Sequence, residues 1–123
     1  MKRMGAKARN EVLLQAIAAL EKASRKQRGG IWKAAAEKLK KPRRQRISVN
    51  LWKVNAMHEK MGEKFLLVPG KVLGFGALDR AVNVIAFEFS GDAKEQIGRK
   101  GRALTIMEAL KENIKASEVA IVC

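Results

Sequence analysis

The sequence Lys38-Leu-Lys-Lys-Pro-Arg-Arg-Gln-Arg-Ile-Ser-Val-Asn-Leu51 joins a helix-forming part of the chain to a strand-forming part. Pro42 cannot continue a helix, because it lacks a backbone N–H and its ring clashes with the preceding turn. Proline also favours extended backbone at the residue before it, which is Lys41. From Ile47 to Leu51 apolar and polar residues alternate, the pattern of a strand with one buried face. The segment therefore predicts a helix end, an extended arm and the start of a sheet.

The extended arm is strongly basic. Five positive charges fall within seven residues with no acid among them, at Lys40, Lys41, Arg43, Arg44 and Arg46. Such a run repels itself and resists ordering alone. Lysines and arginines that neutralise phosphates release condensed counterions, and this term supplies most sequence-independent affinity for nucleic acids. The arm therefore indicates a polyphosphate partner.

Charge divides the chain into two parts. The 123 residues are 47% hydrophobic and carry a net charge of +14, which suits one domain with a real core and a polyanionic partner. Residues 1–46 hold 15 Lys and Arg against 3 Asp and Glu, whereas residues 47–123 hold 11 against 9. We therefore expect a basic helical N-terminal arm over 1–46 and a compact α/β domain over 47–123, together forming one structural unit.

The sequence offers little for membrane insertion, secretion or catalysis. No apolar run approaches the ~18–20 residues of a membrane span, and the basic start lacks the apolar stretch of a signal peptide. The single cysteine, Cys123, can form neither an internal disulfide nor a zinc site alone. His58 is the only histidine, and no Cys or Asp stands at ligand or triad spacing from it. We expect a cytoplasmic protein that is not an enzyme and holds no metal or cofactor.

Two helices are expected before the arm. Asn10 has the residue type of an N-cap, and apolar residues at helical spacing continue to about Ala23. Ser24–Gly30 is expected to be a basic loop, because its two glycines stop a helix. A second helix is expected over Ile31–Leu39. Trp32 in that helix is interpreted as a core anchor, with a base-stacking platform as the alternative.

After the arm, strands and helices alternate. Residues 52–61 are ambiguous between strand and helix, and their apolar spacing favours a short helix capped by Asn50 and ended by Gly62. Thr105 and Glu108 resemble a capping box. The other expected elements are strands over Phe65–Val68 and Lys71–Leu73 with a bend at Pro69-Gly70 between them, a turn at Gly74–Gly76, a buried strand over Val82–Phe89, a helix from Ser90 through Ile97, a strand over Arg102–Thr105, a helix to about Asn113 and a strand over Glu118–Val122.

Other functions remain as alternatives at this point. Gly74-Phe75-Gly76-Ala77 imitates the centre of an RNA-recognition-motif signature, but Leu73 and Asp79 are not the residue types that the signature needs. Gly98-Arg99-Lys100-Gly101 fits the GXXG loop with which KH domains grip a nucleic-acid backbone. A KH-like module for single-stranded RNA is therefore one alternative. A protein-binding adaptor that uses the apolar helix near Leu13–Leu20 is another.

Stretches spread over nearly the whole chain share one family pattern. They are Ser24-Arg25-Lys26, Ile31-Trp32, Ala36-Glu37-Lys38-Leu39, Lys41-Pro42-Arg43-Arg44-Gln45-Arg46, Val49-Asn50-Leu51, Val68-Pro69-Gly70-Lys71-Val72-Leu73-Gly74 and Phe87-Glu88-Phe89-Ser90. In these stretches the chain resembles the archaeal and eukaryotic large-subunit ribosomal protein family eighteen-e, a relative of bacterial large-subunit protein fifteen. The resemblance runs from about Asn10 to Val122, and the short length resembles the archaeal members. Trp52 departs from the pattern, because the family usually has a small hydroxyl residue there.

The resemblance implies a component of the large ribosomal subunit that binds its RNA, beside neighbouring ribosomal proteins and away from any membrane. It also implies irregular β-β-α units wound as a superhelix. We expect the protein to contact phosphates and read shape, because A-form helices hide their base edges in a deep groove. The expected RNA-contact residues are Arg25, Lys26, Arg28, Lys33, Lys40, Lys41, Arg43, Arg44, Gln45, Arg46, Asn50, Lys53, Lys71, Gly74 and Gly76.

Overall fold

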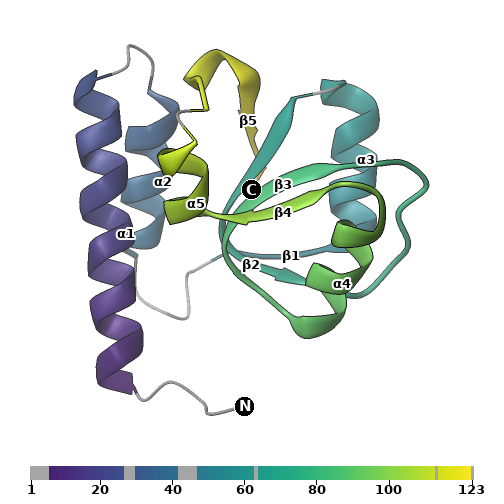
Figure 1. Cartoon of the computed structure of the whole chain (residues 1–123), viewed down its shortest axis with the longest axis horizontal. Coiled ribbons are helices and arrows are strands. Elements are labelled where there is room, and N and C mark those ends of the chain that lie inside the picture. The colour runs from purple at the N-terminus through teal and green to yellow at the C-terminus, as the bar shows by residue number, and fades with distance from the viewer. Residues whose placement is uncertain (1–5, 27–29, 42–46, 63, 113, 123) are drawn as a thin grey trace.

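A five-stranded parallel sheet lies between two layers of helices (Figure 1). The computed structural model describes residues 6–26, 30–41, 47–62, 64–112 and 114–122. The predicted α/β class is confirmed, and residues 65–100 run strand, strand, helix, the β-β-α order that the family resemblance implies. The elements in chain order are α1 (Ala6–Lys26), α2 (Ile31–Leu39), β1 (Ile47–Asn50), α3 (Leu51–Met61), β2 (Phe65–Leu73), β3 (Asn83–Phe89), α4 (Gly91–Lys100), β4 (Arg102–Thr105), α5 (Ile106–Lys111), the 3-10 turn η2 (Ala116–Glu118) and β5 (Val119–Ile121).

The strand β2 is central because it pairs with three others. One of its edges pairs with β3. On its other edge, Phe65–Leu67 pairs with β5 and Gly70–Leu73 pairs with β1. The register with β3 shifts between Val68 and Lys71, the step that contains Pro69, which has no N–H to donate to a ladder. The predicted bend is thus a bulge inside one continuous strand.

Alternate side chains of the strands pack into the two helical layers. Leu67 and Ile85 cluster with buried residues of α1, α2 and α5, whereas Leu66 and Val84 cluster with those of α3 and α4. This division follows from the strand geometry, in which successive side chains point to opposite faces. Trp32 is fully buried in the first cluster, so its predicted role as a core anchor is confirmed. The basic N-terminal helices therefore share a core with the sheet.

The connection from β2 to β3 has no helix. Parallel strands need a crossover that returns along the sheet, and here residues 74–82 make that return as a loop. The loop lies along α3, where the Trp52 backbone N–H donates to the Phe75 carbonyl oxygen at 3.2 Å. The Asn55 side-chain amide also donates to the Asp79 carboxylate at 3.1 Å. These contacts replace the packing that a crossover helix would supply.

The first helix is longer than predicted at both ends. It begins at Ala6 and ends at Lys26, so the first residues of the expected basic loop are helical. The Ser24 hydroxyl donates to the Glu21 carbonyl oxygen at 2.7 Å and is thereby satisfied within the helix. Arg25 and Lys26 are good helix formers, and their positive charges are favourable in a last turn.

The fourth helix also runs further than predicted and removes the GXXG loop. Its N-terminus is capped as expected, because the Ser90 hydroxyl accepts a hydrogen bond from the Ala93 N–H at 3.2 Å. The helix then continues through Gly98 to Lys100. It ends at Gly101, where any side chain would overlap the Val82 backbone. A contact distant in sequence, rather than the first glycine, sets this helix end.

Smaller boundary differences occur at α3 and α5. Leu51 begins α3 instead of ending β1. Asn50 occupies the N-cap position of α3 with extended backbone, but its side chain makes no cap hydrogen bond. Gly62 ends α3 as predicted, with a φ of 70° that favours glycine. The last helix ends at Lys111, before Asn113, which lies outside the described residues.

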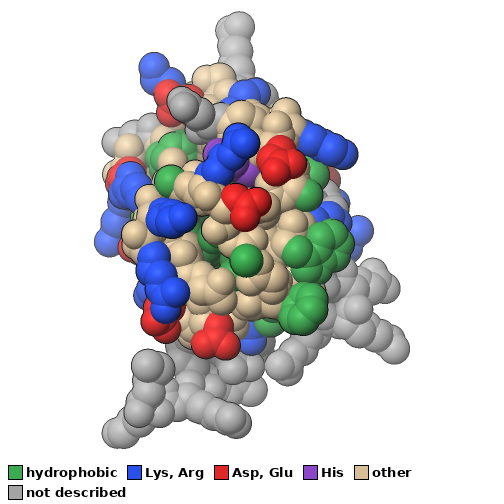
Figure 2. All heavy atoms as spheres, turned by 90° about the vertical axis from the view of Figure 1, so that its right-hand side faces the viewer, with side chains coloured by type: hydrophobic (Ala, Val, Ile, Leu, Met, Phe, Trp, Pro, Cys, Tyr) green, Lys and Arg blue, Asp and Glu red, His purple; other side chains and the backbone are tan. Residues whose placement is uncertain are grey.

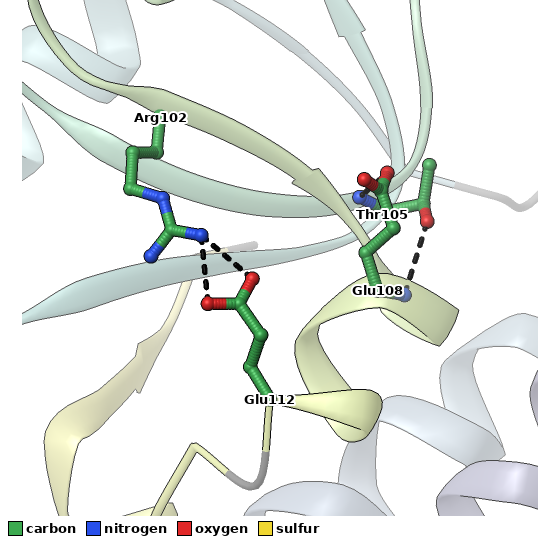
Figure 3. Close-up of polar contacts among 4 residues, drawn as sticks. All are labelled: Arg102, Thr105, Glu108 and Glu112. Carbon is green, nitrogen blue, oxygen red and sulfur yellow. Dashed lines mark hydrogen bonds and ion pairs between the residues drawn. The ribbon is translucent and has the colours of Figure 1, made fainter.

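Replacing Thr105 by alanine should destabilise the fold by about 1 kcal/mol. The Thr105 hydroxyl accepts from the Glu108 N–H at 3.3 Å, and the Glu108 carboxylate accepts from the Thr105 N–H at 3.1 Å (Figure 3). This is the predicted capping box, and alanine removes its hydroxyl acceptor. Chemical denaturation of both variants would measure the effect. Thr105→Ser should keep most of the stability; an equal loss in Thr105→Ser would instead point to methyl packing.

Candidate nucleic-acid interface

The cations of the N-terminal helices point away from the core because their helices bury the opposite face. On α2, Trp32 and Leu39 are fully buried while Lys33 is exposed. At the end of α1, Arg25 and Lys26 are exposed in the last turn. The partial negative charge of a helix C-terminus stabilises such cations. These positions thus agree with an outward-facing basic surface.

Part of the predicted contact set lies outside the described residues. This part comprises Arg28, Arg43, Arg44, Gln45 and Arg46. The described members of the extended arm are Lys40 and Lys41, both exposed after the end of α2. The arm therefore follows the C-terminal end of one helix and precedes the first residue of β1.

Lys40 already has an anionic partner in the protein. Its ammonium lies 2.9 Å from the Glu21 carboxylate and links the end of α2 to α1. The hydrogen bond and the charge of Lys40, with a smaller effect from Arg25, lower the pKa of Glu21 below its ordinary value. A phosphate that binds Lys40 must therefore compete with Glu21, so we expect Lys40 to contribute less than an unpaired lysine.

The carboxyl ends of β1 and β2 bring other predicted residues to one end of the sheet. Asn50 ends β1, and Gly74 and Gly76 follow β2. Lys71 is exposed. It lies in register with Ser48 on β1 and with Glu88 on β3. Lys53, half-buried in the first turn of α3, stands near the same end.

The two glycines are packed against protein. A Cβ atom on Gly74 would lie 2.7 Å from the Asp92 Cβ, and the Gln96 side chain donates to the Gly74 carbonyl oxygen at 3.3 Å. Gly76 has a φ of 111°, and a Cβ atom there would lie 2.6 Å from the Trp52 nitrogen. Both positions thus require glycine for packing. Their contact with RNA stays a prediction.

Several cations of the C-terminal part are paired with acids. Arg99 lies 3.0 Å from Glu95 on the same helix, and Arg102 donates to both Glu112 carboxylate oxygens at 2.7 and 2.6 Å (Figure 3). The hydrogen bond and the charge of Glu112 raise the pKa of Arg102 above its ordinary value. These pairs balance charge within the chain, whereas Arg25 and Lys26 at the end of α1 are both exposed.

Sequence reasoning missed one exposed feature, the aromatic pair Trp52 and Phe75. Their side chains are 55% and 74% exposed, although aromatic residues usually bury much of their area. A signal was present at Phe75, because an aromatic residue between two glycines in a turn has no regular element to carry it into the core. The exposure of Trp52 follows from its place on the outer side of α3.

Among the described residues, no three or more His, Cys, Asp or Glu side chains lie close enough together to hold a metal ion. His58 is half-buried on α3, and its Nδ1 atom has no hydrogen-bond partner among the described atoms. A search of the described helices also finds none that is long and apolar enough to cross a bilayer.

Comparisons with known proteins find archaeal relatives over most of the chain. A protein of Haloarcula marismortui is 37% identical over 113 residues, which cover 92% of this chain and 96% of that protein. One of Methanothermobacter thermautotrophicus is 38% identical over 114 residues, and one of Methanococcus maripaludis is 44% identical over 106 residues, 85% of this chain and 87% of that protein. Each is named large ribosomal subunit protein eL18. No family model matches the chain.

Proposed function

The chain belongs to the large ribosomal subunit protein eL18 family, and from this we propose that it is a structural component of the large subunit that binds and stabilises folded ribosomal RNA. Its place of action is then the ribosome in the cytoplasm, and it is not an enzyme. The observation that carries the proposal is the uneven charge, 15 Lys and Arg against 3 Asp and Glu over residues 1–46. The described cations at the end of α1 face outward, whereas Arg99 and Arg102 are paired with acids.

Phosphate contact is the mechanism that these residue types support. Arginine can grip a phosphate with two parallel N–H donors, and lysine adds a compact point charge. Together they hold an RNA backbone by shape and charge, without a base code. Neighbouring ribosomal proteins are proposed as further partners. The proposed contact residues remain Arg25, Lys26, Arg28, Lys33, Lys40, Lys41, Arg43, Arg44, Gln45, Arg46, Asn50, Lys53, Lys71, Gly74 and Gly76.

The two alternative functions are not favoured. The hypothesis of a KH-like module needs a GXXG loop, but Gly98 and the two residues after it belong to α4.

The hypothesis of a protein-binding adaptor needs an apolar face of α1 that is open to a partner. Ala16, Ile17 and Leu20 instead bury that face against the chain's own core.

Removing three arginines of the arm should reduce the salt dependence of RNA binding. Arg43, Arg44 and Arg46 replaced together by alanine should lower the slope of log affinity on log salt by about 2 to 3, because each lost phosphate contact removes about 0.7–0.9. Filter binding to large-subunit ribosomal RNA purified from Methanococcus maripaludis would measure the slope. Co-sedimentation with large subunits would show the same weakening.

The control is a second triple variant with an equal loss of charge. Replacing Arg99, Lys100 and Arg102 by alanine removes three positive charges, two of which are already paired with acids. Its slope should stay close to that of the unmodified protein. If both triple variants lower the slope by the same amount, net charge alone matters and the arm has no special place in binding.

A further inference from the structure

An exposed aromatic pair stands where the β2–β3 loop meets α3. Trp52, the second residue of α3, is 55% exposed, and Phe75 is 74% exposed. The Trp52 backbone N–H donates to the Phe75 carbonyl oxygen at 3.2 Å. Two aromatic side chains that are distant in sequence are therefore carried by backbone positions in direct contact.

The backbone that carries this pair is well fixed. Gly76 follows Phe75 with a φ of 111° and lies against the Trp52 backbone nitrogen. Further along the loop, Asn55 and Asp79 exchange two hydrogen bonds, of 3.1 and 3.2 Å. The loop is thus attached to α3 at two points. A partner that binds the rings needs to order little backbone, which lowers the entropic cost of binding.

We propose that Trp52 and Phe75 form a stacking platform for an unpaired base of large-subunit ribosomal RNA, a proposal that rests on the function proposed above. Aromatic side chains stack on bases of any sequence, because every base has a π face. Unpaired bases in loops and bulges of folded RNA are the usual targets of such stacking. The platform would add affinity that the phosphate contacts cannot supply.

The net charge of the chain and the small size of the patch favour RNA over a protein partner. The charged residues around the pair are Lys53, Asp79 and Arg80 along the chain and Asp92, which lies against Gly74. Because these charges balance locally, the attraction for the backbone that carries a base comes from the chain's net charge of +14. A specific protein interface usually needs a wider area, of roughly 800 Å² per partner.

The surrounding surface agrees with a small platform. On the side formed by α3 and α4, hydrophobic side chains gather mainly at the right-hand border, and charged side chains are scattered over the rest among backbone and other side chains (Figure 2). Among the described residues of α3 and the β2–β3 loop, the large exposed hydrophobic side chains are Trp52, Met61 and Phe75. Met61 belongs to the other end of α3, so the aromatic pair stands largely alone.

Removing the indole tests the proposal. Trp52→Ala should weaken binding to large-subunit ribosomal RNA of Methanococcus maripaludis by about 5- to 150-fold, the range expected for loss of one stacked base. The salt slope should not change, because no phosphate contact is lost. Trp52→Phe should keep most of the affinity. The matched control is Leu14→Ala, which removes a side chain that is 65% exposed on α1 and should have no effect.

Fluorescence gives a second readout at the same residue. The chain has two tryptophans, and Trp32 is fully buried. The difference in emission between the unmodified protein and Trp52→Phe therefore reports Trp52. Saturation with the RNA should quench this signal and protect it from acrylamide, because a stacked base covers the indole face.

The outcomes separate this proposal from the proposed function. If the unmodified protein does not bind the RNA, the proposed function fails. If it binds with a steep salt dependence, but Trp52→Ala binds equally well and Trp52 stays open to acrylamide, only the stacking platform fails. In that case the pair would be free to meet a protein neighbour. Melting curves of Trp52→Ala that match the unmodified protein would show that a loss of affinity is not a loss of folding.

Discussion

Raising the salt concentration from 50 to 200 mM should weaken the binding of this chain to large-subunit ribosomal RNA by about 10³- to 10⁵-fold, if ~6–10 phosphates are contacted. Each phosphate that a lysine or arginine neutralises releases part of a condensed counterion, and added salt opposes that release. The front third of the chain holds enough cations for such a number, with 15 Lys and Arg in residues 1–46. Filter binding at five or six salt concentrations would give the slope.

Two controls exclude other causes of a loss of affinity. Circular dichroism at each salt concentration should show the same folded signal, so that unfolding cannot mimic release. An uncharged osmolyte at matched osmolality should leave the affinity unchanged, because it does not alter counterion release. A loss of less than about tenfold over the same range would contradict phosphate binding and favour a contact through apolar surface.

Local signals in the sequence predicted the elements well. Ser90 and Thr105 each stand before a helix, and both accept the expected cap hydrogen bonds. Such caps involve residues only three positions apart, so their chemistry is visible in a short window. The switch to alternating residues at Ile47 likewise marked β1. The α/β class could therefore be predicted from pattern alone.

Contacts between distant residues could not be predicted in this way. The end of α4 depends on Gly101 passing close to Val82, and nothing near Gly98 shows that the helix continues past it. Lys40 looked like an unpaired cation of the arm, yet it contacts Glu21 on another helix. A residue type gives the chemistry of a side chain, while the tertiary fold decides which partner it meets.

The glycines of the proposed site show the same limit. The two glycines after β2, Gly74 and Gly76, are predicted to contact RNA. The structure places Asp92 against Gly74 and Trp52 against Gly76. A glycine indicates that something passes close to the backbone, but the sequence does not say whether that is RNA or protein. The exposure of Trp52 was missed for a related reason, because apolar spacing in α3 does not show which face the sheet covers.

Replacing Trp32 by alanine should destabilise the whole chain by about 3–5 kcal/mol. Trp32 is fully buried in the cluster that joins α1 and α2 to Leu67 and Ile85 of the sheet. Alanine there loses most of a large apolar side chain and leaves a cavity that the surroundings fill only partly. Domains of this size have a total stability of about 5–15 kcal/mol, so the variant should be marginal. Urea denaturation followed by circular dichroism would measure the loss.

The matched control is the other tryptophan. Trp52→Ala removes an equal side chain from a half-exposed position and should destabilise the chain by about 1 kcal/mol at most, well below the loss at Trp32. The Trp32 variant also tests whether residues 1–46 and 47–123 act as one unit. Because the buried cluster spans both parts, the helical signal and the hydrogen-exchange protection of β2 and β3 should be lost in one transition. Loss of α1 and α2 at low urea, with the strands still protected as in the unmodified protein, would show two independent units instead.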